Sequence, residues 1–539
     1  MKKSFGRSAL ALAVIGITAK LIGALYRVPL TNIVGAEGMG LYQMVFPLYT
    51  VLLAFCGGGV TNAVSRVVAK YTARGDSGTA KRVIKVAIVP LAAVSALSAG
   101  SVALLRNIIS VVQGNADASL AYLALSPSLL FAGGISVLRG YFQGRSLMLP
   151  SGVSQLVEQV IKLALGLSLA RLLLKFGVKF AVAGALIGVS ASELLALIYL
   201  FVRFLIYRRG RILAPSVAAA MAESATDAVF VTDRELRREI YLFALPVTLG
   251  SLVLPVTQMI DSALVINILI RSGAGREGAT ALFGLFVGPV GTLINMPSVV
   301  VLSVAIAFLP TLTAAVERGD KQKIIAVKRD AAKWIMLFVI PVTTAFLLFP
   351  TPIVSALYRR GLTAEQLSVA ASILRIQAVG VLFSGVIQLT TTIMQAHNFS
   401  HKPVINLVIG ACIKVALTPL LVGKVGIIGA AGATTACYGV AAALNSRAVY
   451  KVGGVGAAIK HALLLPTVFS ALSAGAFIGI YAALSFTALP VLWKAAIAAA
   501  VFLAVYASIL FFGVIDLSAV KKALYAKKLR EAKRRQEKE

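Results

Sequence analysis

Two stretches of this chain resemble each other at a separation of 240–252 residues. Residues 35–76 begin with GAEGMGLY and end with ARGD, and residues 275–320 begin with GREGATALFG and end with ERGD. Further along, Gln143 of the first copy corresponds to Gln395 of the second. An internal repeat of this length in an apolar chain predicts two equivalent helical bundles, an arrangement typical of transporters that open to each side of a membrane in turn.

The composition places these repeats in a membrane. Of the 539 residues, 59% are hydrophobic and 13% are charged, and the mean hydropathy is +0.91. Apolar runs of about 20 residues, the length that crosses a bilayer as a helix, recur along the whole chain. We therefore predict an all-α polytopic membrane protein with about fourteen transmembrane helices. Two pseudo-symmetric six-helix lobes would be followed by a C-terminal helix pair outside the repeat.

The apolar runs and the charged stretches between them define five segments. We expect a first lobe in residues 1–207, a cytoplasmic linker in residues 208–239, a second lobe in residues 240–451, the extra helix pair in residues 452–514 and a basic cytoplasmic tail in residues 515–539.

Basic residues are concentrated in alternate connections. The chain holds 52 Lys and Arg against 20 Asp and Glu, a net charge of +32. The positive-inside rule then predicts that both termini are cytoplasmic. Because each lobe has an even number of spans, six, the two lobes are predicted to have parallel orientation. Residues 1–25 start with basic residues and become apolar but lack a small-residue cleavage site, so we interpret them as an uncleaved first span.

Charged side chains inside apolar runs mark candidate functional positions, because each costs about 2.5–3.5 kcal/mol to insert. In the first run, Gly16, Lys20, Gly23 and Arg27 follow one another at spacings that place them on one helix face. Two cations and two glycines on one face suit a cavity wall that a bulky anion approaches. As an alternative, Arg27 lies near the end of the run and could reach water.

The fifth run also carries polar residues on one face, namely Gln155, Glu158 and Lys162. Glu158 and Lys162 lie four residues apart, so we expect them to neutralise each other. The repeat preserves the lysine as Lys414, but Gly410 stands where a matching glutamate would be. We therefore expect Lys414 either to pair across the lobe interface or to face an aqueous seam.

The seventh run contains a carboxylate next to a helix break. Pro246 and Pro255 interrupt regular hydrogen bonding, and Gln258 and Asp261 follow the second proline at one-turn spacing. A lone carboxylate at this position could bind a proton or a monovalent cation, or it could balance the charge of a cavity lysine.

The sequence shows no pattern typical of a metal site, a nucleotide-binding site or a catalytic site. The three cysteines lie in apolar runs without metal-ligand spacing, and His397 and His401 alone do not make a metal site. The chain has no nucleotide-binding motif ending in GKS or GKT and no nucleophile–base–acid grouping. We predict a transporter rather than an enzyme, with no cofactor or metal; a proton or monovalent cation used for coupling stays an alternative.

A family resemblance is carried by the stretches from Lys20 to Arg27 and from Gly35 to Gln43, by Pro47, and by residues 63–66 followed by residues 74–76. With the order of the apolar runs and the extra terminal pair, the chain resembles the polysaccharide-biosynthesis branch of the multidrug/oligosaccharidyl-lipid/polysaccharide exporter superfamily. This branch holds the SpoVB-type and MurJ-type flippases. Arginines that Gram-negative MurJ-type proteins carry in the second and eighth spans are absent from residues 39–65 and 279–316, which favours the SpoVB-type branch.

The resemblance implies a flippase in the bacterial cytoplasmic membrane. Its substrate would be a polyprenyl-pyrophosphate-linked cell-wall precursor, either lipid II or a related lipid-linked oligosaccharide, moved by alternating access in peptidoglycan, spore-cortex or polysaccharide synthesis. The expected partners are this substrate, membrane lipids and cell-wall synthesis proteins, with no nucleic acid, and the chain is expected to be a monomer. The candidate cavity residues are Lys20, Arg27, Lys162, Gln258, Asp261 and Lys414.

Two other classes stay open. A cation-coupled multidrug exporter would need acidic and aromatic cavity residues, and Glu158, Glu193 and Asp261 are the few acidic residues inside the runs. A non-transporting assembly scaffold would not need buried lysines matched across two repeats.

Overall fold

The computed structural model describes residues 15–16, 18–208, 231–451, 456–487, 489 and 491–514. Within these ranges the chain is helical and contains no strand. Eleven helical segments of the described part are long and apolar enough to cross a membrane. The predicted all-α polytopic fold is therefore confirmed, with fourteen as an approximate number of spans. The predicted tail, 515–539, lies outside the described residues.

The first half of the chain forms one bundle. It starts with helical residues 18–25. The elements that follow are α2 (Arg27–Leu53), η1 (Ala54–Gly58), α3 (Val60–Ala73), α4 (Ser77–Val112), α5 (Ala118–Gly144), α6 (Met148–Leu173), η2 (Leu174–Phe176) and α7 (Val178–Arg208).

The second half contributes α9 (Asp233–Ser251), which packs on the first bundle, and then forms another bundle and the extra helix pair. Its further elements are α10 (Val253–Leu269), η3 (Ile270–Ala274), α11 (Arg276–Leu285), η4 (Phe286–Val290), α12 (Gly291–Glu317), α13 (Lys321–Leu348), α14 (Pro350–Tyr358), α15 (Ala364–Ala396), α16 (His401–Val425), α17 (Ile427–Lys451), α18 (Gly456–Ser485) and α19 (Val491–Val514).

The predicted repeat is confirmed by the backbone of matching turns. Gly35 (φ 69°, ψ −170°) and Gly275 (φ 66°, ψ 169°) adopt nearly the same left-handed conformation, which glycine reaches without a Cβ clash. Ser146 (φ 60°) and Asn398 (φ 62°) are the non-glycine residues of the described chain with positive φ. They lie 252 residues apart, the separation of the Gln143 match, so the turns of the two lobes have the same backbone geometry.

Two matching helix starts agree with this. Gly75 (φ 75°) and Gly319 (φ 66°) each precede an aspartate. Asp76 and Asp320 then accept a hydrogen bond from the backbone N–H three residues on, at 2.8 and 3.0 Å, and so cap α4 and α13. The ARGD and ERGD sequences of the repeat are therefore paired turn-and-cap motifs.

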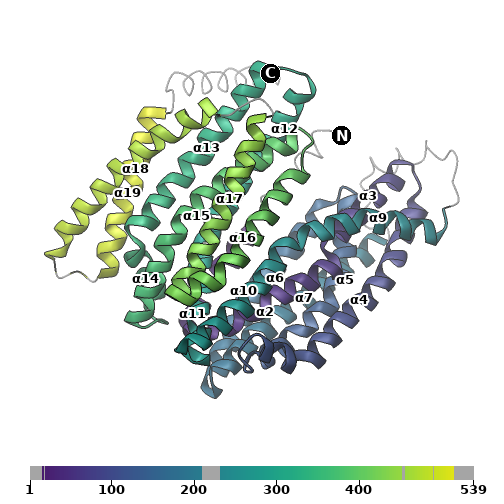
Figure 1. Cartoon of the computed structure of the whole chain (residues 1–539). Helices are drawn as coiled ribbons and strands as arrows, with labels where there is room; N and C mark the ends of the chain where they lie inside the picture. Colours follow the sequence, from purple (N-terminus) through teal and green to yellow (C-terminus); the bar gives the residue numbers. More distant parts are fainter. Residues whose placement is uncertain are drawn as a thin grey trace, which may run out of the picture.

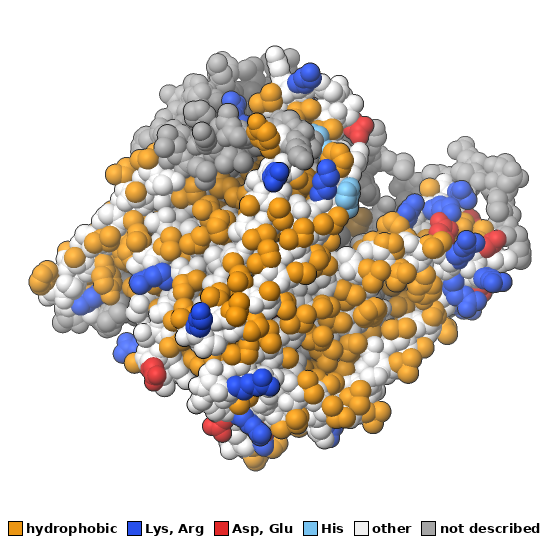
Figure 2. All heavy atoms as spheres, viewed as in Figure 1, with side chains coloured by type: hydrophobic (Ala, Val, Ile, Leu, Met, Phe, Trp, Pro, Cys, Tyr) orange, Lys and Arg blue, Asp and Glu red, His pale blue; other side chains and the backbone are white. Residues whose placement is uncertain are grey.

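The two bundles meet at one end of the molecule and diverge towards the other (Figure 1). We call the first the Gly35 end and the second the Asp76 end. Hydrophobic side chains cover the middle of the face shown in Figure 2, while Lys and Arg gather towards the ends, as expected for a protein that crosses a bilayer. Helices α18 and α19 pack on α13 and α14 at the flank of the second lobe.

Helices α9 and α10 pass from one lobe to the other. Helix α9 packs on α3 and α4, whereas α10 packs on both α2 and α16. The two helices join at Leu252, close to Pro255, where the absent proline N–H interrupts the hydrogen-bond ladder. The seventh span is therefore broken at the lobe boundary.

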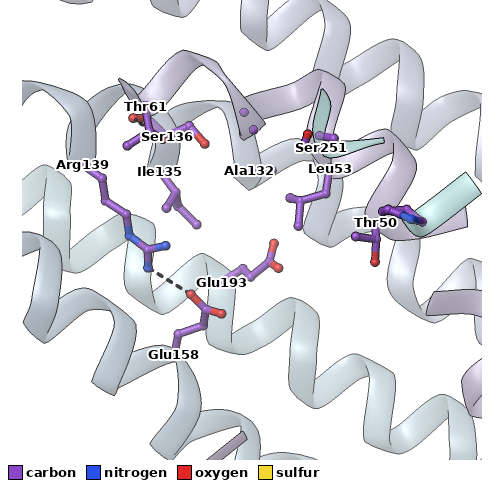
Figure 3. A pocket seen from close by; sticks show the side chains of 14 residues that line it. Thr50, Leu53, Thr61, Ala132, Ile135, Ser136, Arg139, Glu158, Glu193 and Ser251 are labelled. Carbon is purple, nitrogen blue, oxygen red and sulfur yellow. Dashed lines mark hydrogen bonds and ion pairs between the residues drawn. The ribbon is translucent and has the colours of Figure 1, made fainter. Parts of the chain in front are cut away.

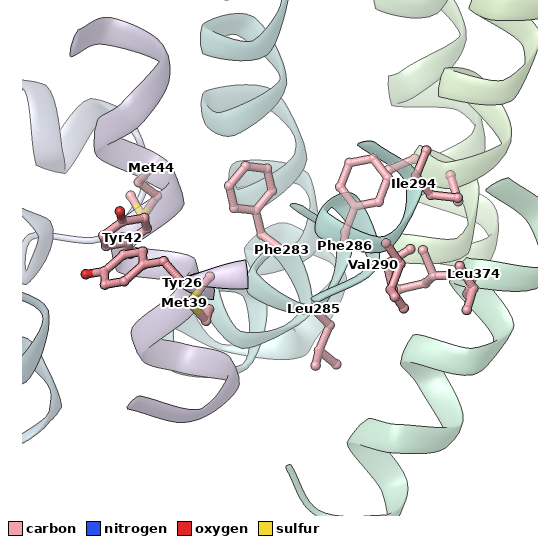
Figure 4. Packing of buried hydrophobic residues seen from close by; sticks show 14 of the residues in the cluster. Tyr26, Met39, Tyr42, Met44, Phe283, Leu285, Phe286, Val290, Ile294 and Leu374 are labelled. Carbon is pink, nitrogen blue, oxygen red and sulfur yellow. The ribbon is translucent and has the colours of Figure 1, made fainter. Parts of the chain in front are cut away.

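Backbone contact between α2 and α11 closes the Gly35 end. A Cβ atom on Gly40 would lie 2.1 Å from the carbonyl oxygen of Thr280, and a Cβ atom on Gly284 would lie 2.0 Å from that of Ala36. Buried hydrophobic side chains continue across this contact from α2 through α11 and η4 to α12 and α15 (Figure 4). Small residues thus let the lobes approach closely within the membrane.

Polar side chains reinforce the same closure. Asn115, in the α4–α5 turn, donates from Nδ2 to the Thr280 hydroxyl at 2.9 Å. Gln113 donates to the Ser262 hydroxyl at 3.3 Å, and Asn267 donates to the Val112 carbonyl at 3.0 Å. The α4–α5 turn therefore ties the first lobe to α10 and α11 at the Gly35 end.

Candidate functional site

A cavity of about 350 Å³ lies in the wall of the first lobe, beside the α9–α10 junction (Figure 3). It is formed by α2, η1, α3, α5, α6 and α7, with Ser251 and Pro255 closing it from the junction. Its charged side chains are Arg139, Glu158 and Glu193. We call it the Arg139 cavity.

Arg139 is held in this cavity by α6. Its Nη2 atom lies 3.0 Å from Oε2 of Glu158, and its Nε donates to the Ser154 hydroxyl at 2.9 Å. The predicted ion pair between Glu158 and Lys162 is therefore wrong. The turn at Ser146 folds α6 back along α5, so that the arginine reaches Glu158 from the neighbouring helix.

Glu193 contributes a second buried carboxylate. Its side chain is 7% exposed and accepts a hydrogen bond from the hydroxyl of Tyr49 on α2. Its Oε2 atom has no partner among the described residues. Figure 3 shows its carboxylate directed away from Glu158, towards the side of the cavity where Leu53 lies. From the sequence, Glu193 stood out only as one of the few acidic residues within the runs.

Two of the predicted cations lie near each other in the first lobe. The Lys162 ammonium lies 5.2 Å from the ring centroid of Tyr26 and 5.7 Å from that of Phe46, within range of cation–π attraction. Arg27 lies close enough to interact electrostatically with Lys162. The two aromatic rings therefore stabilise the charge of Lys162, whose ammonium has no carboxylate oxygen within 4.0 Å among the described residues.

Lys20 differs from these two cations, because its side chain is exposed. The glycines of its helix face α6. A Cβ atom on Gly23 would lie 2.6 Å from Oε1 of Gln159, and one on Gly16 would lie 3.6 Å from Oε1 of Gln155. In this conformation the glycine face is filled by α6 side chains, and the approach of an anion to it stays a prediction.

The remaining three predicted residues come together in the second lobe. Asp261 on α10 and Lys414 on α16 form an ion pair, and both are buried, at 5% and 8% exposed. Gln258 lines the same cavity of about 110 Å³, together with Asn295 and Gln377. We call it the amide cavity. Lys414 is therefore paired, but within the second lobe and not across the lobe interface, and Asp261 balances the charge of a lysine, which was one of its alternatives.

Arg139 and Gln377 were not predicted from the sequence. Arg139 directly follows the fourth apolar run, where an arginine is also explained by membrane topology. Arg139 and Glu158 lie on opposite sides of the turn at Ser146, and opposite charges so placed on two consecutive helices are the sequence signal that could have identified the ion pair. Gln377 is uncharged and lies within an apolar helix, so a search for intramembrane charges does not detect it.

Two bundles of membrane-spanning helices that meet at one end and diverge towards the other define the class: a two-lobed, multi-pass membrane transporter. Residues 5–316, more than half of the chain, match the family described as polysaccharide biosynthesis protein. The chain belongs to this family. The predicted resemblance to the polysaccharide-biosynthesis branch is thereby confirmed.

Two curated relatives extend the match. Stage V sporulation protein B of Bacillus subtilis (strain 168) is 25% identical over 464 residues, which is 85% of this chain and 86% of that protein. Lipid II flippase MurJ of the same organism is 25% identical over 437 residues, which is 78% of each chain.

Solved structures agree on the fold. A structure of lipid II flippase MurJ in an inward closed conformation has a TM-score of 0.69 at 14% identity, covering 93% of this chain and 99% of that one. An inward-facing multidrug resistance MATE family transporter of the MOP superfamily has a TM-score of 0.64 at 15% identity, covering 82% of this chain and 100% of that one. Flippases and multidrug exporters share this fold, so the fold alone does not select the substrate.

Proposed function

We propose that this protein is a flippase that moves a polyprenyl-pyrophosphate-linked cell-wall precursor, lipid II or a related lipid-linked oligosaccharide, across the bacterial cytoplasmic membrane. Its sequence relatives include a protein named as a lipid II flippase and a sporulation protein. A substrate of this class has an anionic pyrophosphate that hydrocarbon excludes and a lipid tail that water excludes. The carrier needs a polar seam for the head and apolar surface for the tail.

The observation that carries the proposal is the difference in charge between the two walls of the seam. The first-lobe wall holds three cations (Arg27, Arg139, Lys162) and two carboxylates (Glu158, Glu193), a sum of +1. In the second-lobe wall, Asp261 and Lys414 cancel. A net positive wall at membrane depth is expensive unless it receives an anion.

Apolar surface for a lipid tail is present on the second lobe. A cavity of about 460 Å³ lies between α13, α14 and the extra pair α18 and α19. It is lined by hydrophobic side chains from both helix pairs, with Phe349 and Phe477 stacked at a centroid distance of 3.5 Å. The extra pair thereby provides hydrocarbon-like surface that a two-lobed carrier of soluble molecules does not need.

The mechanism we propose is alternating access by rocking of the lobes. With the Asp76 end cytoplasmic, the conformation described above is closed to the outside by α2 and α11. An inside-negative potential is worth about 2.3 kcal/mol per charge per 100 mV, more than the ~1.4 kcal/mol that changes an equilibrium tenfold. A cationic seam would therefore be drawn back to the inward-open state after it releases its anion outside, without ATP.

A cation-coupled multidrug exporter is the second candidate. Glu193, with an unpartnered oxygen, and Glu158 give the Arg139 cavity an acidic component that an organic cation could use. The two candidate functions make different demands on the first-lobe wall: a flippase would need its cations to bind an anionic lipid, whereas an exporter of organic cations would need its carboxylates.

The test is rescue of a bacterium depleted of its lipid II flippase. The wild-type chain should restore growth. Lys162→Met should restore it at least tenfold less efficiently at equal abundance, because a cation of the seam is lost, whereas Lys175→Met, at an exposed position in η2, should behave as wild type. Resistance to cationic dyes without any rescue would favour the multidrug exporter.

A further inference from the structure

The amide cavity of the second lobe is chemically unlike the Arg139 cavity. It is bounded by α10, η4, α12, α15, α16 and α17. Its charges are those of Asp261 and Lys414, which pair with each other and leave the cavity neutral. A phosphate would have to compete with Asp261 for its cation, so the cavity suits an uncharged group.

Three side-chain amides line this cavity without a protein partner that would satisfy them. Gln377 is 6% exposed, and its Oε1 atom accepts no hydrogen bond within the described chain. Gln258 and Asn295 are exposed residues that line the same cavity, and their side-chain amides form no hydrogen bond with other described residues. A buried polar atom left unsatisfied costs about 1–3 kcal/mol, which a ligand with N–H or O–H groups would offset.

The size of the cavity limits the group that it can take. At roughly 30 Å³ for a water molecule, its volume of about 110 Å³ corresponds to a group of about four heavy atoms. An acetamido group of a sugar, with four heavy atoms, has this size, and a hydroxymethyl group, with two, is smaller. Amide side chains both donate and accept hydrogen bonds, and so match such substituents in either role. The phenol of Tyr438 adds an aromatic wall.

We propose that the amide cavity is a saccharide subsite, which receives an uncharged N-acetyl or hydroxyl substituent of the sugar attached to the pyrophosphate. This inference rests on the proposed function. The two walls of the seam then divide the head group: the cationic first lobe takes the pyrophosphate and the neutral second lobe takes the sugar. A head group that carries both a pyrophosphate and a sugar would therefore contact both lobes.

The experiment compares two lipids that differ only in the sugar-bearing part. Binding of lipid II and of undecaprenyl pyrophosphate to the full-length protein in nanodiscs is measured for wild type and for Gln377→Leu. We expect the affinity for lipid II to fall about tenfold, because a hydrogen-bonding partner of the sugar is lost. The affinity for undecaprenyl pyrophosphate should stay unchanged.

Matched variants make the outcome decisive. Gln388→Leu changes a half-buried glutamine on the same helix, α15, that does not line the cavity, and it should leave both affinities as in wild type. If Gln377→Leu lowers the melting temperature, Asn295→Leu replaces it. Unchanged lipid II affinity, or equal loss for both lipids, overturns the saccharide subsite and leaves the flippase proposal standing. Failure of the wild-type protein to bind either lipid overturns both.

Discussion

At the level of single residues, the second lobe shows how a charge is kept at membrane depth. Lys414 and Asp261 come from different helices and are both buried, so each removes the cost of leaving the other unpaired. Removing one member of a buried pair costs about 3–5 kcal/mol, while replacing both by neutral groups of similar size is often close to neutral. Each member of the pair therefore stabilises the protein only while the other member is present.

This leads to a prediction about the pair. Lys414→Met should lower the stability of the detergent-solubilised protein by about 3–5 kcal/mol, because Asp261 is left buried and unpaired. Adding Asp261→Asn should restore most of the loss. Thermal unfolding of the two single variants and the double variant gives the coupling directly.

A control is available at the surface. Lys179 and Asp117 form an ion pair at 3.2 Å with 48% of each side chain exposed. Lys179→Met should cost less than about 1 kcal/mol, because solvent already screens the pair. Equal losses for Lys414→Met and Lys179→Met would contradict the assignment of a buried pair.

At the level of elements, the closure of the Gly35 end depends on the crossing of α2 and α11. Gly40 and Gly284 bring the two backbones into contact, and a side chain at either position would meet a carbonyl oxygen that cannot move without its helix. Small residues are the usual means of close helix approach in a bilayer, where burial of apolar surface gives little drive for association. The crossing is therefore the element most sensitive to added volume.

Gly40→Val should hold α2 and α11 apart. A cysteine at Ser262, which is 0% exposed beneath the α4–α5 turn, should then react with a thiol reagent, although it is protected in the parent protein. The measurement needs a background without Cys56, Cys412 and Cys437. Gly100→Val is the matched control on α4, since a Cβ atom there meets nothing within 4 Å. Continued protection of Ser262→Cys in the Gly40→Val protein would show that the crossing does not close this end.

At the level of the whole molecule, the sequence was enough to predict the two lobes, because their signals are local. Apolar runs, glycines that take positive φ and aspartate caps each act within a few residues, and they recur at matching positions such as Gly35 and Gly275. The partner of Glu158 was mispredicted because it depends on how α5 and α6 face each other. Gln377 was missed for a similar reason, since its relevance depends on a cavity formed by six helical elements.

The last prediction concerns the rocking of the lobes as a whole. Asn115→Cys and Thr280→Cys replace two side chains that are hydrogen-bonded at 2.9 Å across the lobe boundary, so a disulfide between them should hold the Gly35 end closed. Lipid flipping by the cross-linked protein in vesicles should fall to background, and reduction should restore it. The control joins Asn406 and Asn445, which are hydrogen-bonded at 2.8 Å between α16 and α17 within the second lobe. That cross-link should leave flipping intact, because the lobe moves as a unit. Full activity with the Gly35 end cross-linked would rule out opening at this end, and alternating access by rocking with it.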